Sequence, residues 1–286
     1  MQATSAELSH NTKLVEDYLV LLGEPLNHHH PSQVYKAIDQ NQNNRILAVK
    51  IIPAHKILSD ERTFNTYLNI HNKLDTPNVV KMVDLKRTQN NLYVFFEYCE
   101  NGSLENIIQS NKTVSEKTAC AIIRQIAAAF LSIEKANLKD GDGAQVCLMH
   151  RNLRPDHILL HKGSVKLADF SYSKLINVEL KYHKRNHTIL GTPMYMAPEI
   201  LVGQAYSSKC DVWSAGVILY QLLFGRFPWI GYSPIELYNN IKSKPLEFPR
   251  ILGKKTSDLL VKMLTFDDES RASWSDVYEH PVHKQS

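Results

Sequence analysis

The chain has 286 residues, and its 33 basic and 29 acidic side chains leave a formal net charge of +4 at pH 7. That small excess does not indicate a nucleic-acid-binding protein, and a hydrophobic share of 43% excludes a wholly disordered chain. The longest apolar run, 215–224, is far shorter than the roughly 20 residues that span a bilayer, so no membrane association is expected. Four scattered cysteines and a polar start without an apolar leader favour an intracellular, cytoplasmic protein.

The predicted elements change in character near residue 99. Residues 1–14 are polar and are expected to form an N-terminal tail. Runs of β-branched and aromatic residues bounded by polar turns predict strands over 17–24, 32–39, 45–52, 79–85 and 91–98. Apolar residues at helical spacing predict helices over 60–74, 115–136, 211–224, 233–243 and 256–264. A β-rich piece followed by a helical piece predicts an α+β chain with two lobes.

Several sequence blocks occur in an order that is hard to obtain by chance. They are AVK (48–50), HRNLRPDHILL (150–160), ADFS (168–171), GTPMYMAPE (191–199), DVWSAG (211–216) and Arg271. Together they resemble the eukaryotic protein kinase family, and the GTPMYMAPE block favours its Ser/Thr type. The resemblance implies a kinase-like domain over 15–283. Its small antiparallel β N-lobe with one helix would cover about 15–98, the hinge 97–101, and the larger helical C-lobe 102–283.

The resemblance also implies phosphoryl transfer from ATP to a protein, with Mg²⁺ neutralising the phosphate charge. It places Lys50 at the α- and β-phosphates and Asp169 at one Mg²⁺. The positions that it assigns to ATP are Gly23, Val34, Ala48, Lys50, Phe96 as a bulky gatekeeper, Glu97, Cys99 and Leu159. A protein substrate or a protein partner is implied as well, and the oligomeric state stays open.

The expected phosphate-binding parts of the N-lobe depart from the family pattern. Family members hold the lysine with a glutamate on the following helix, and counting back ten residues from Pro77 places Tyr67 at that position. The nearest acid upstream, Glu61, is six residues away and therefore about 120° off the required helix face, unless the register is shifted. The segment expected to cover the phosphates has only Gly23 as a glycine, and Pro25, which lacks an amide donor, stands where a second is expected.

The catalytic loop departs at three positions. Asn152 replaces the aspartate that takes the proton of the substrate hydroxyl, and an amide has no usable basicity. Arg154 replaces the lysine near the γ-phosphate and keeps its charge but not its shape. His157 replaces the asparagine that binds a second Mg²⁺ and is a weak partner for a hard, oxygen-seeking cation. Ser171 follows Asp169-Phe170 where the family usually has glycine, so this segment is expected to switch conformation less readily.

Other positions match the scaffold of the family. Glu199 and Arg271 correspond to its buried ion pair, and Asp211 corresponds to the residue that accepts the catalytic-loop amides. The resemblance places an activating phosphothreonine at Thr188, with Arg151 as the residue that would meet the phosphate. The basic run 181–187 is interpreted as a solvated face, His28–His30 as a solvated loop in preference to a metal site, and 137–147 as a surface insertion.

Three functions are compatible with this pattern. The first is a pseudokinase, which binds a partner and perhaps nucleotide and regulates through conformation. The second is an active but slow Ser/Thr kinase, because phosphoryl transfer depends mainly on positioning and electrostatics. The third is a related phosphotransferase with different chemistry. Intact scaffold positions beside an altered catalytic set favour the first hypothesis.

Overall fold

The computed structural model describes residues 11–27, 33–59, 67–71, 73–74, 76–111, 113–136, 138, 143–177 and 193–284. The chain divides into two compact units. We call the first, Met1–Asp75 with Val80–Glu100, the N-lobe, and the second, Thr76–Val79 with Asn101–Ser286, the C-lobe. The N-lobe is built on a sheet and the C-lobe is mainly helical, which confirms the predicted α+β class.

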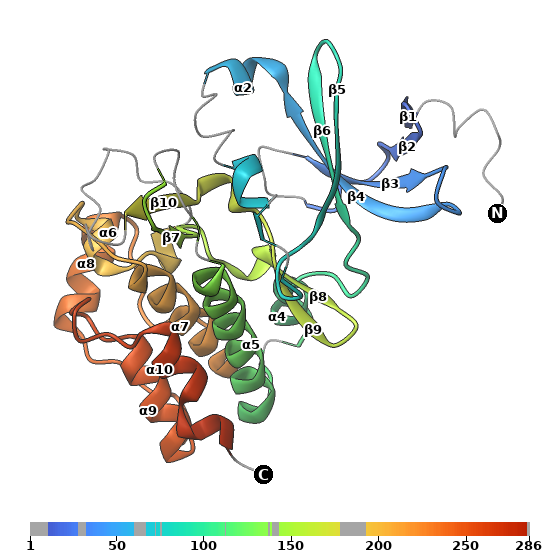
Figure 1. The fold of residues 1–286 in the computed structure, drawn as a ribbon. Coiled ribbons are helices and arrows are strands. Elements are labelled where there is room, and N and C mark those ends of the chain that lie inside the picture. The colour runs from blue at the N-terminus through green and yellow to red at the C-terminus, as the bar shows by residue number, and fades with distance from the viewer. Residues whose placement is uncertain are drawn as a thin grey trace. The chain divides into compact units, whose positions relative to one another are not determined.

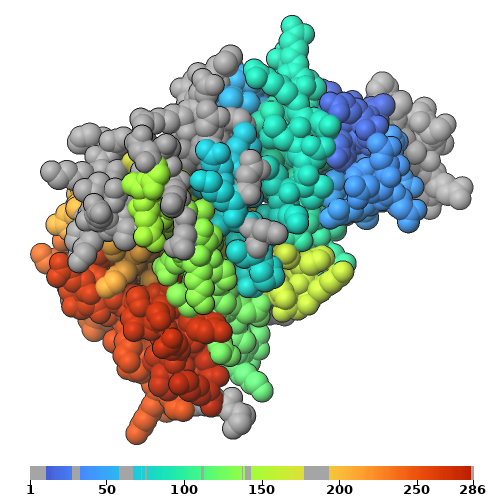
Figure 2. Space-filling view, in the orientation of Figure 1, coloured from blue at the N-terminus to red at the C-terminus, as the bar shows by residue number. Residues whose placement is uncertain are grey.

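Six strands form the N-lobe sheet in the order β1-β2-β3-β4-β6-β5 (Figure 1). They are β1 (Thr12–Val15), β2 (Tyr18–Leu21), β3 (Val34–Asp39), β4 (Arg45–Pro53), β5 (Met82–Arg87) and β6 (Asn91–Glu97). Every neighbouring pair is antiparallel. The β5–β6 hairpin projects from the sheet in both Figure 1 and Figure 2. Helix α2 (Ala54–Ser59) follows β4, and residues 67–71 and 73 are also helical.

The N-lobe differs from its sequence prediction at two places. Strand β1 begins at Thr12, inside the stretch expected to be a tail, and pairs with β2 across a two-residue turn at Glu16 and Asp17. Only one of its four residues, Val15, is buried, so β1 has too little alternation to reveal itself in the sequence. Helix α2 has only six residues, which is too few for a periodic signal.

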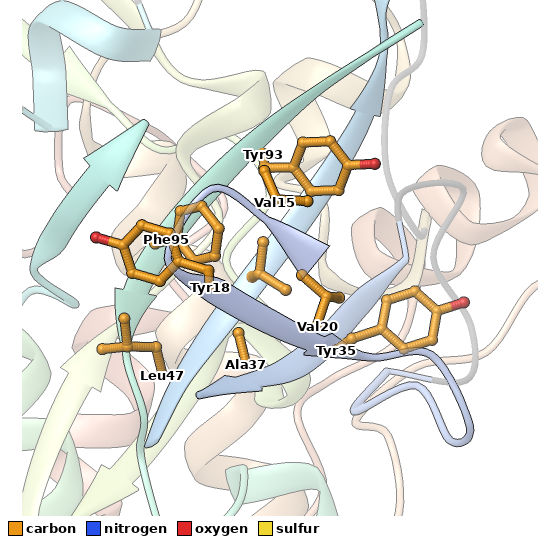
Figure 3. Close-up of a cluster of buried hydrophobic side chains, with 9 residues drawn as sticks. Val15, Tyr18, Val20, Tyr35, Ala37, Leu47, Tyr93 and Phe95 are labelled. Atoms are coloured by element: carbon orange, nitrogen blue, oxygen red, sulfur yellow. The ribbon is translucent and has the colours of Figure 1, made fainter. Parts of the chain in front are cut away.

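Nine buried side chains from five strands form the N-lobe core (Figure 3). They are Val15, Tyr18, Val20, Tyr35, Ala37, Leu47, Val49, Tyr93 and Phe95. The rings of Tyr18 and Phe95 stack with centroids 4.0 Å apart. The Tyr18 hydroxyl donates to Asp84 Oδ2 at 2.7 Å, so its polar end is satisfied at the edge of the core. Burial on alternate residues of β3 shows why the predicted period of two is correct here.

The C-lobe contains helices and two small antiparallel hairpins, β7–β10 and β8–β9. The strands are β7 (Val146–Met149), β8 (Ile158–His161), β9 (Ser164–Leu167) and β10 (Lys174–Asn177). The α-helices are α4 (Leu104–Asn111), α5 (Glu116–Lys135), α6 (Pro198–Leu201), α7 (Lys209–Phe224), α8 (Pro234–Ser243), α9 (Lys254–Met263) and α10 (Trp274–Glu279). Short 3-10 helices cover Pro155–His157, Phe170–Tyr172, Pro193–Tyr195 and Pro281–Lys284.

Helix α7 is the centre of the C-lobe. All of its residues from Cys210 to Leu223 are buried, as expected for a helix that is apolar on every side. A Cβ atom on Gly216 would lie 2.9 Å from Leu264 Cδ2, so this glycine allows the close approach of the α9 end. Gly225 ends the helix at φ 67°, a left-handed conformation that favours glycine.

The longer predicted helices are confirmed as α5, α7, α8 and α9, with boundaries within two residues. Ser115 caps α5 by accepting the amide of Thr118, as its sequence signature indicates. The shorter helices α4, α6 and α10 were not predicted. Within the described part of the chain, no helix combines the length and the apolar character needed to cross a membrane.

Adjacent residues of β4 allow a direct test of the N-lobe core. Leu47 is fully buried, whereas the side chain of Ile46 is about half exposed. We expect Leu47→Ala to lower the free energy of unfolding by about 2–5 kcal/mol because it leaves a cavity. Ile46→Ala is the matched control and should cost less than about 1 kcal/mol. Urea denaturation measures both, and equal losses would contradict the assigned register of β4.

Candidate active site

In the N-lobe, Lys50 lies on the central strand β4, and its side chain is buried. Its Nζ atom lies 5.7 Å from the centroid of the Tyr67 ring, a distance typical of cation–π contact. Tyr67 meets His71 edge to face at 4.7 Å, and His71 lies 5.1 Å from Phe96. Aromatic contacts thus connect the lysine to the predicted gatekeeper. Glu61 lies outside the described residues.

The other predicted N-lobe positions share the same part of the sheet. Val34 on β3 is the cross-strand partner of Lys50, and Ala48 on β4 is the partner of Phe96 on β6. Glu97 ends β6 and accepts the Lys81 amide at Oε1, 2.8 Å away. Cys99, in the predicted hinge, is buried as a free thiol.

The segment after β2 uses its own polar groups internally. Gly23 begins it, and the Leu26 amide donates to the Val34 carbonyl at 2.7 Å. The Asn27 side chain accepts the Val34 amide at 2.8 Å. The Leu26 amide is therefore engaged, and Pro25 has no amide to offer. The histidines at 28–30 lie outside the described residues.

In the C-lobe, the catalytic loop is fixed by a carboxylate from α7. Asp211 is buried and accepts the amides of His150 at 2.7 Å and Arg151 at 2.8 Å. Burial raises the pKa of this carboxyl, while His150 and the two amide bonds act against that rise. Arg151 has φ 63°, a conformation that costs a non-glycine residue energy unless its surroundings impose it. Asp211 supplies that restraint.

Two further hydrogen bonds orient Arg151 itself. Its Nε donates to the Tyr172 carbonyl at 2.7 Å, and one terminal nitrogen lies 3.4 Å from the Tyr206 hydroxyl. Both partners lie in the C-lobe. Thr188, the expected phosphorylation site, and the basic run 181–187 lie outside the described residues, so a contact between Thr188 and Arg151 stays a prediction.

The altered residues of the catalytic loop contact one another. Asn152 is buried, and its backbone carbonyl lies 2.8 Å from His157 Nδ1. His157 Nε2 lies 3.5 Å from Asp169 Oδ2 and 3.8 Å from Asp156 Oδ2. Arg154 pairs through Nε with Asp156, two residues further along. The structure thus brings the predicted metal positions together and gives Arg154 an acidic partner within the same loop.

Asp169 is held by its own neighbours. It caps the short helix at 170–172, where its Oδ1 accepts the Ser171 hydroxyl at 2.6 Å and the Ser171 amide at 3.4 Å. Sequence reasoning considered Ser171 only as a loss of flexibility and missed this hydroxyl. It also missed Asp156. The Asp-Phe-Ser order was the available signal, because aspartate side chains often accept hydrogen bonds from the residue two positions on.

Leu159 lies on β8, which is tied to the start of the C-lobe. It forms a bridge with Ser103, and the Leu160 amide donates to the Gly102 carbonyl at 2.9 Å. The Lys162 amide donates to the Asn101 side chain at 3.0 Å. These bonds fix the hairpin that presents Leu159.

Glu199 and Arg271 form a bidentate ion pair. The two Nη–Oε distances are 2.8 and 2.9 Å, and both residues are buried. Arg271 also donates to the carbonyls of Thr265, Lys209 and Phe266 and lies 5.1 Å from the Trp213 ring centroid. Its donors are thus well satisfied, which a buried guanidinium requires.

The donor atoms allow a test of the implied metal. Asp169 offers carboxylate oxygens, which Mg²⁺ prefers. His157 offers an imidazole nitrogen, which suits transition metals better than Mg²⁺. In the described ranges, no three His, Cys, Asp or Glu side chains are grouped so that they could hold an ion alone. The residues therefore fit one Mg²⁺ position and disagree with the second.

Comparison with known proteins decides the family. The model of the protein kinase domain family matches residues 30–283. The chain belongs to the protein kinase family. Its relatives are described as serine/threonine-protein kinases, which supports the Ser/Thr type: ULK3 of Homo sapiens is 31% identical over 256 residues, 87% of this chain and 51% of that protein.

Two further relatives agree. ATG1c of Arabidopsis thaliana is 30% identical over 278 residues, which is 94% of this chain and 36% of the relative. ULK1 of Homo sapiens is 28% identical over 261 residues, which is 87% of this chain and 24% of the relative. This kinase domain therefore spans about half or less of the length of these relatives.

The ion pair at Arg271 predicts a large loss of stability in this kinase domain. Arg271→Met leaves Glu199 buried without its partner, so we expect the free energy of unfolding to fall by about 3–5 kcal/mol. Lys262→Met is the control, because the Lys262–Asp258 pair at 2.8 Å is about half exposed and should contribute less than about 1 kcal/mol. The double variant Glu199→Gln/Arg271→Met should recover part of the loss in urea denaturation. Equal effects of the two single variants would contradict this account.

The buried ring of His150 predicts a pH dependence of stability. Burial lowers the pKa of His150, and its Nε2 lies 3.0 Å from the Ala168 carbonyl. The unfolded chain takes up this proton near pH 6.5 while the folded protein does not. The free energy of unfolding should therefore fall as the pH is lowered below about 6.5.

Replacing the ring tests this assignment. His150→Phe and His150→Gln cannot be protonated, so both variants should show a flatter fall in the free energy of unfolding between pH 7 and 5. Urea denaturation at several pH values measures the slope. Slopes parallel to that of the unmodified protein would contradict the assignment.

Proposed function

We propose that this kinase domain is a pseudokinase, a module that binds nucleotide and a protein partner and transfers phosphate weakly or not at all. The observation that carries the proposal is Asn152 at the position of the catalytic base. Its backbone is fixed beside amides that Asp211 holds, so a substitute base cannot take its place through a simple shift of the loop. Loss of a general base typically costs about 10²–10⁴ in rate.

The contacts of the neighbouring charges support the same proposal. Arg154 is paired with Asp156, and Asp169 accepts the Ser171 hydroxyl and faces His157. Electrostatic stabilisation of a transferring phosphoryl group needs charges aimed at the phosphate. Charges engaged with one another inside the loop are less available for that task.

An active but slow Ser/Thr kinase is the second candidate. Lys50, Asp169 and the positive charge at Arg154 are all present, and phosphoryl transfer depends mainly on positioning and electrostatics. In either case we propose that Lys50 contacts the nucleotide phosphates and that Asp169 binds the accompanying divalent ion. The kinase family binds ATP and Mg²⁺, and protein substrates or partners follow from the same membership.

A radiolabelled phosphate-transfer assay separates the two candidates. We expect the unmodified protein to incorporate no more γ-phosphate, into itself or a generic protein substrate, than Lys50→Ala. Asn152→Asp alone should gain little, because His157 and Tyr67 still differ from the active pattern. The triple variant Asn152→Asp/His157→Asn/Tyr67→Glu should exceed the unmodified protein by about 10²-fold or more.

Thermal melting of each variant is the control, since only variants that remain folded can be compared. Transfer by the unmodified protein at the rate of ordinary kinases, abolished in Lys50→Ala, would falsify the pseudokinase proposal. Slow transfer that depends on Lys50 would favour the second candidate.

A further inference from the structure

The His157 ring is held in one orientation. Its Nδ1 lies 2.8 Å from the Asn152 carbonyl oxygen, and because a carbonyl can only accept, Nδ1 carries the proton. A backbone carbonyl that fixes the tautomer in this way is typical of histidines that bind metals through the other nitrogen. Nε2 is that other nitrogen, and the ring is buried.

Nε2 is directed at a carboxylate that is oriented just as firmly. Asp169 Oδ2 lies 3.5 Å from Nε2, while Oδ1 of the same group accepts the Ser171 hydroxyl at 2.6 Å. A lone pair on Nε2 and a carboxylate oxygen repel each other at this separation unless a cation lies between them. Hydrogen bonds that orient a ligating carboxylate are a usual part of metal sites.

The separation of the two atoms suits one bound ion. Bonds from nitrogen and oxygen to a transition metal are about 2.1 Å long, so two ligand atoms 3.5 Å apart can share an ion. Asp156 Oδ2 is further from Nε2, at 3.8 Å, and Asp156 is already paired with Arg154. The site therefore offers one nitrogen and one carboxylate from the protein.

We propose that the metal ion accompanying nucleotide in this domain is a first-row transition-metal ion, such as Mn²⁺ or Co²⁺, bound by His157 and Asp169 in preference to Mg²⁺. Imidazole nitrogen favours these ions, whereas Mg²⁺ prefers oxygen ligands. Because the described residues offer no third side chain in reach, the remaining ligands are nucleotide phosphate and water. The inference rests on the nucleotide binding in the proposed function.

The affinity for a non-hydrolysable ATP analogue, measured with Mg²⁺, Mn²⁺ or Co²⁺ at equal concentration, tests the preference without any need for activity. Thermal stabilisation of the whole chain reports binding. We expect the apparent affinity to be at least about ten-fold higher with Mn²⁺ or Co²⁺ than with Mg²⁺, since even partners of metal ligands have effects of this size. Mn²⁺ electron paramagnetic resonance should show bound ion in the presence of the analogue.

Three variants make the test specific. His157→Asn restores an oxygen ligand and should remove the preference for Mn²⁺ and Co²⁺ while nucleotide still binds. Asp169→Asn should abolish the bound Mn²⁺ signal. His161→Asn, on strand β8 four residues after His157, is the control and should keep the preference.

The remaining outcomes separate this inference from the proposed function. Equal affinities with Mg²⁺ and Mn²⁺ would overturn the inference and leave the pseudokinase proposal intact. So would nucleotide binding that needs no metal and is unchanged in His157→Asn, because a proton would then account for the contact with Asp169. Absence of nucleotide binding under every condition would overturn both the metal site and the nucleotide-binding part of the proposal, whereas the transfer assay decides catalysis independently.

Discussion

The C-lobe depends on a buried carboxylate that reaches from α7 to the catalytic loop. Asp211 accepts two consecutive amides, those of His150 and Arg151, and so holds Arg151 in the left-handed conformation. A strained backbone persists only where its surroundings over-determine it. The direction of every later side chain in the loop, including Asn152 and His157, follows from this restraint. The loop is therefore positioned as firmly as catalysis would require, although the residues it presents are poorly suited to catalysis.

Stability and chemistry are thus separable in this domain. The Glu199–Arg271 pair and the Gly216 contact involve α7 or its immediate neighbours, and each contributes to packing without touching the altered residues. A chain that retains them keeps its folding free energy whatever stands at position 152. Substitutions at Asn152, Arg154 and His157 then change charge and hydrogen bonding within a loop whose path is already determined. This separation explains how a kinase fold can persist with an altered catalytic set.

The sequence was sufficient for the fold class and for the long elements, because ordered motifs and clear periodicity indicate both. It was insufficient where elements are short: β1 buries one residue of four, and α2 has six residues in all. For the candidate site, residue types and spacing identified the positions but not their contacts. The Ser171 hydroxyl on Asp169 and the Arg154–Asp156 pair depend on side-chain rotamers, which no spacing rule specifies. The ring of Tyr67 beside Lys50 could be anticipated only as the loss of a carboxylate.

The contacts of the altered residues share a physical consequence. An active kinase leaves its lysine, its metal-binding carboxylate and its loop cation to be completed by nucleotide and metal. Here Lys50 lies over an aromatic face, Arg154 has an acidic partner two residues away, and Asp169 has a serine and an imidazole beside it. Each of these contacts lowers the electrostatic cost of the groups in the absence of ligand. It lowers by the same amount what a ligand gains on binding, since a ligand must displace or share the existing partner. A regulatory domain tolerates this exchange because it needs a defined resting conformation more than it needs a large stabilisation of a transition state.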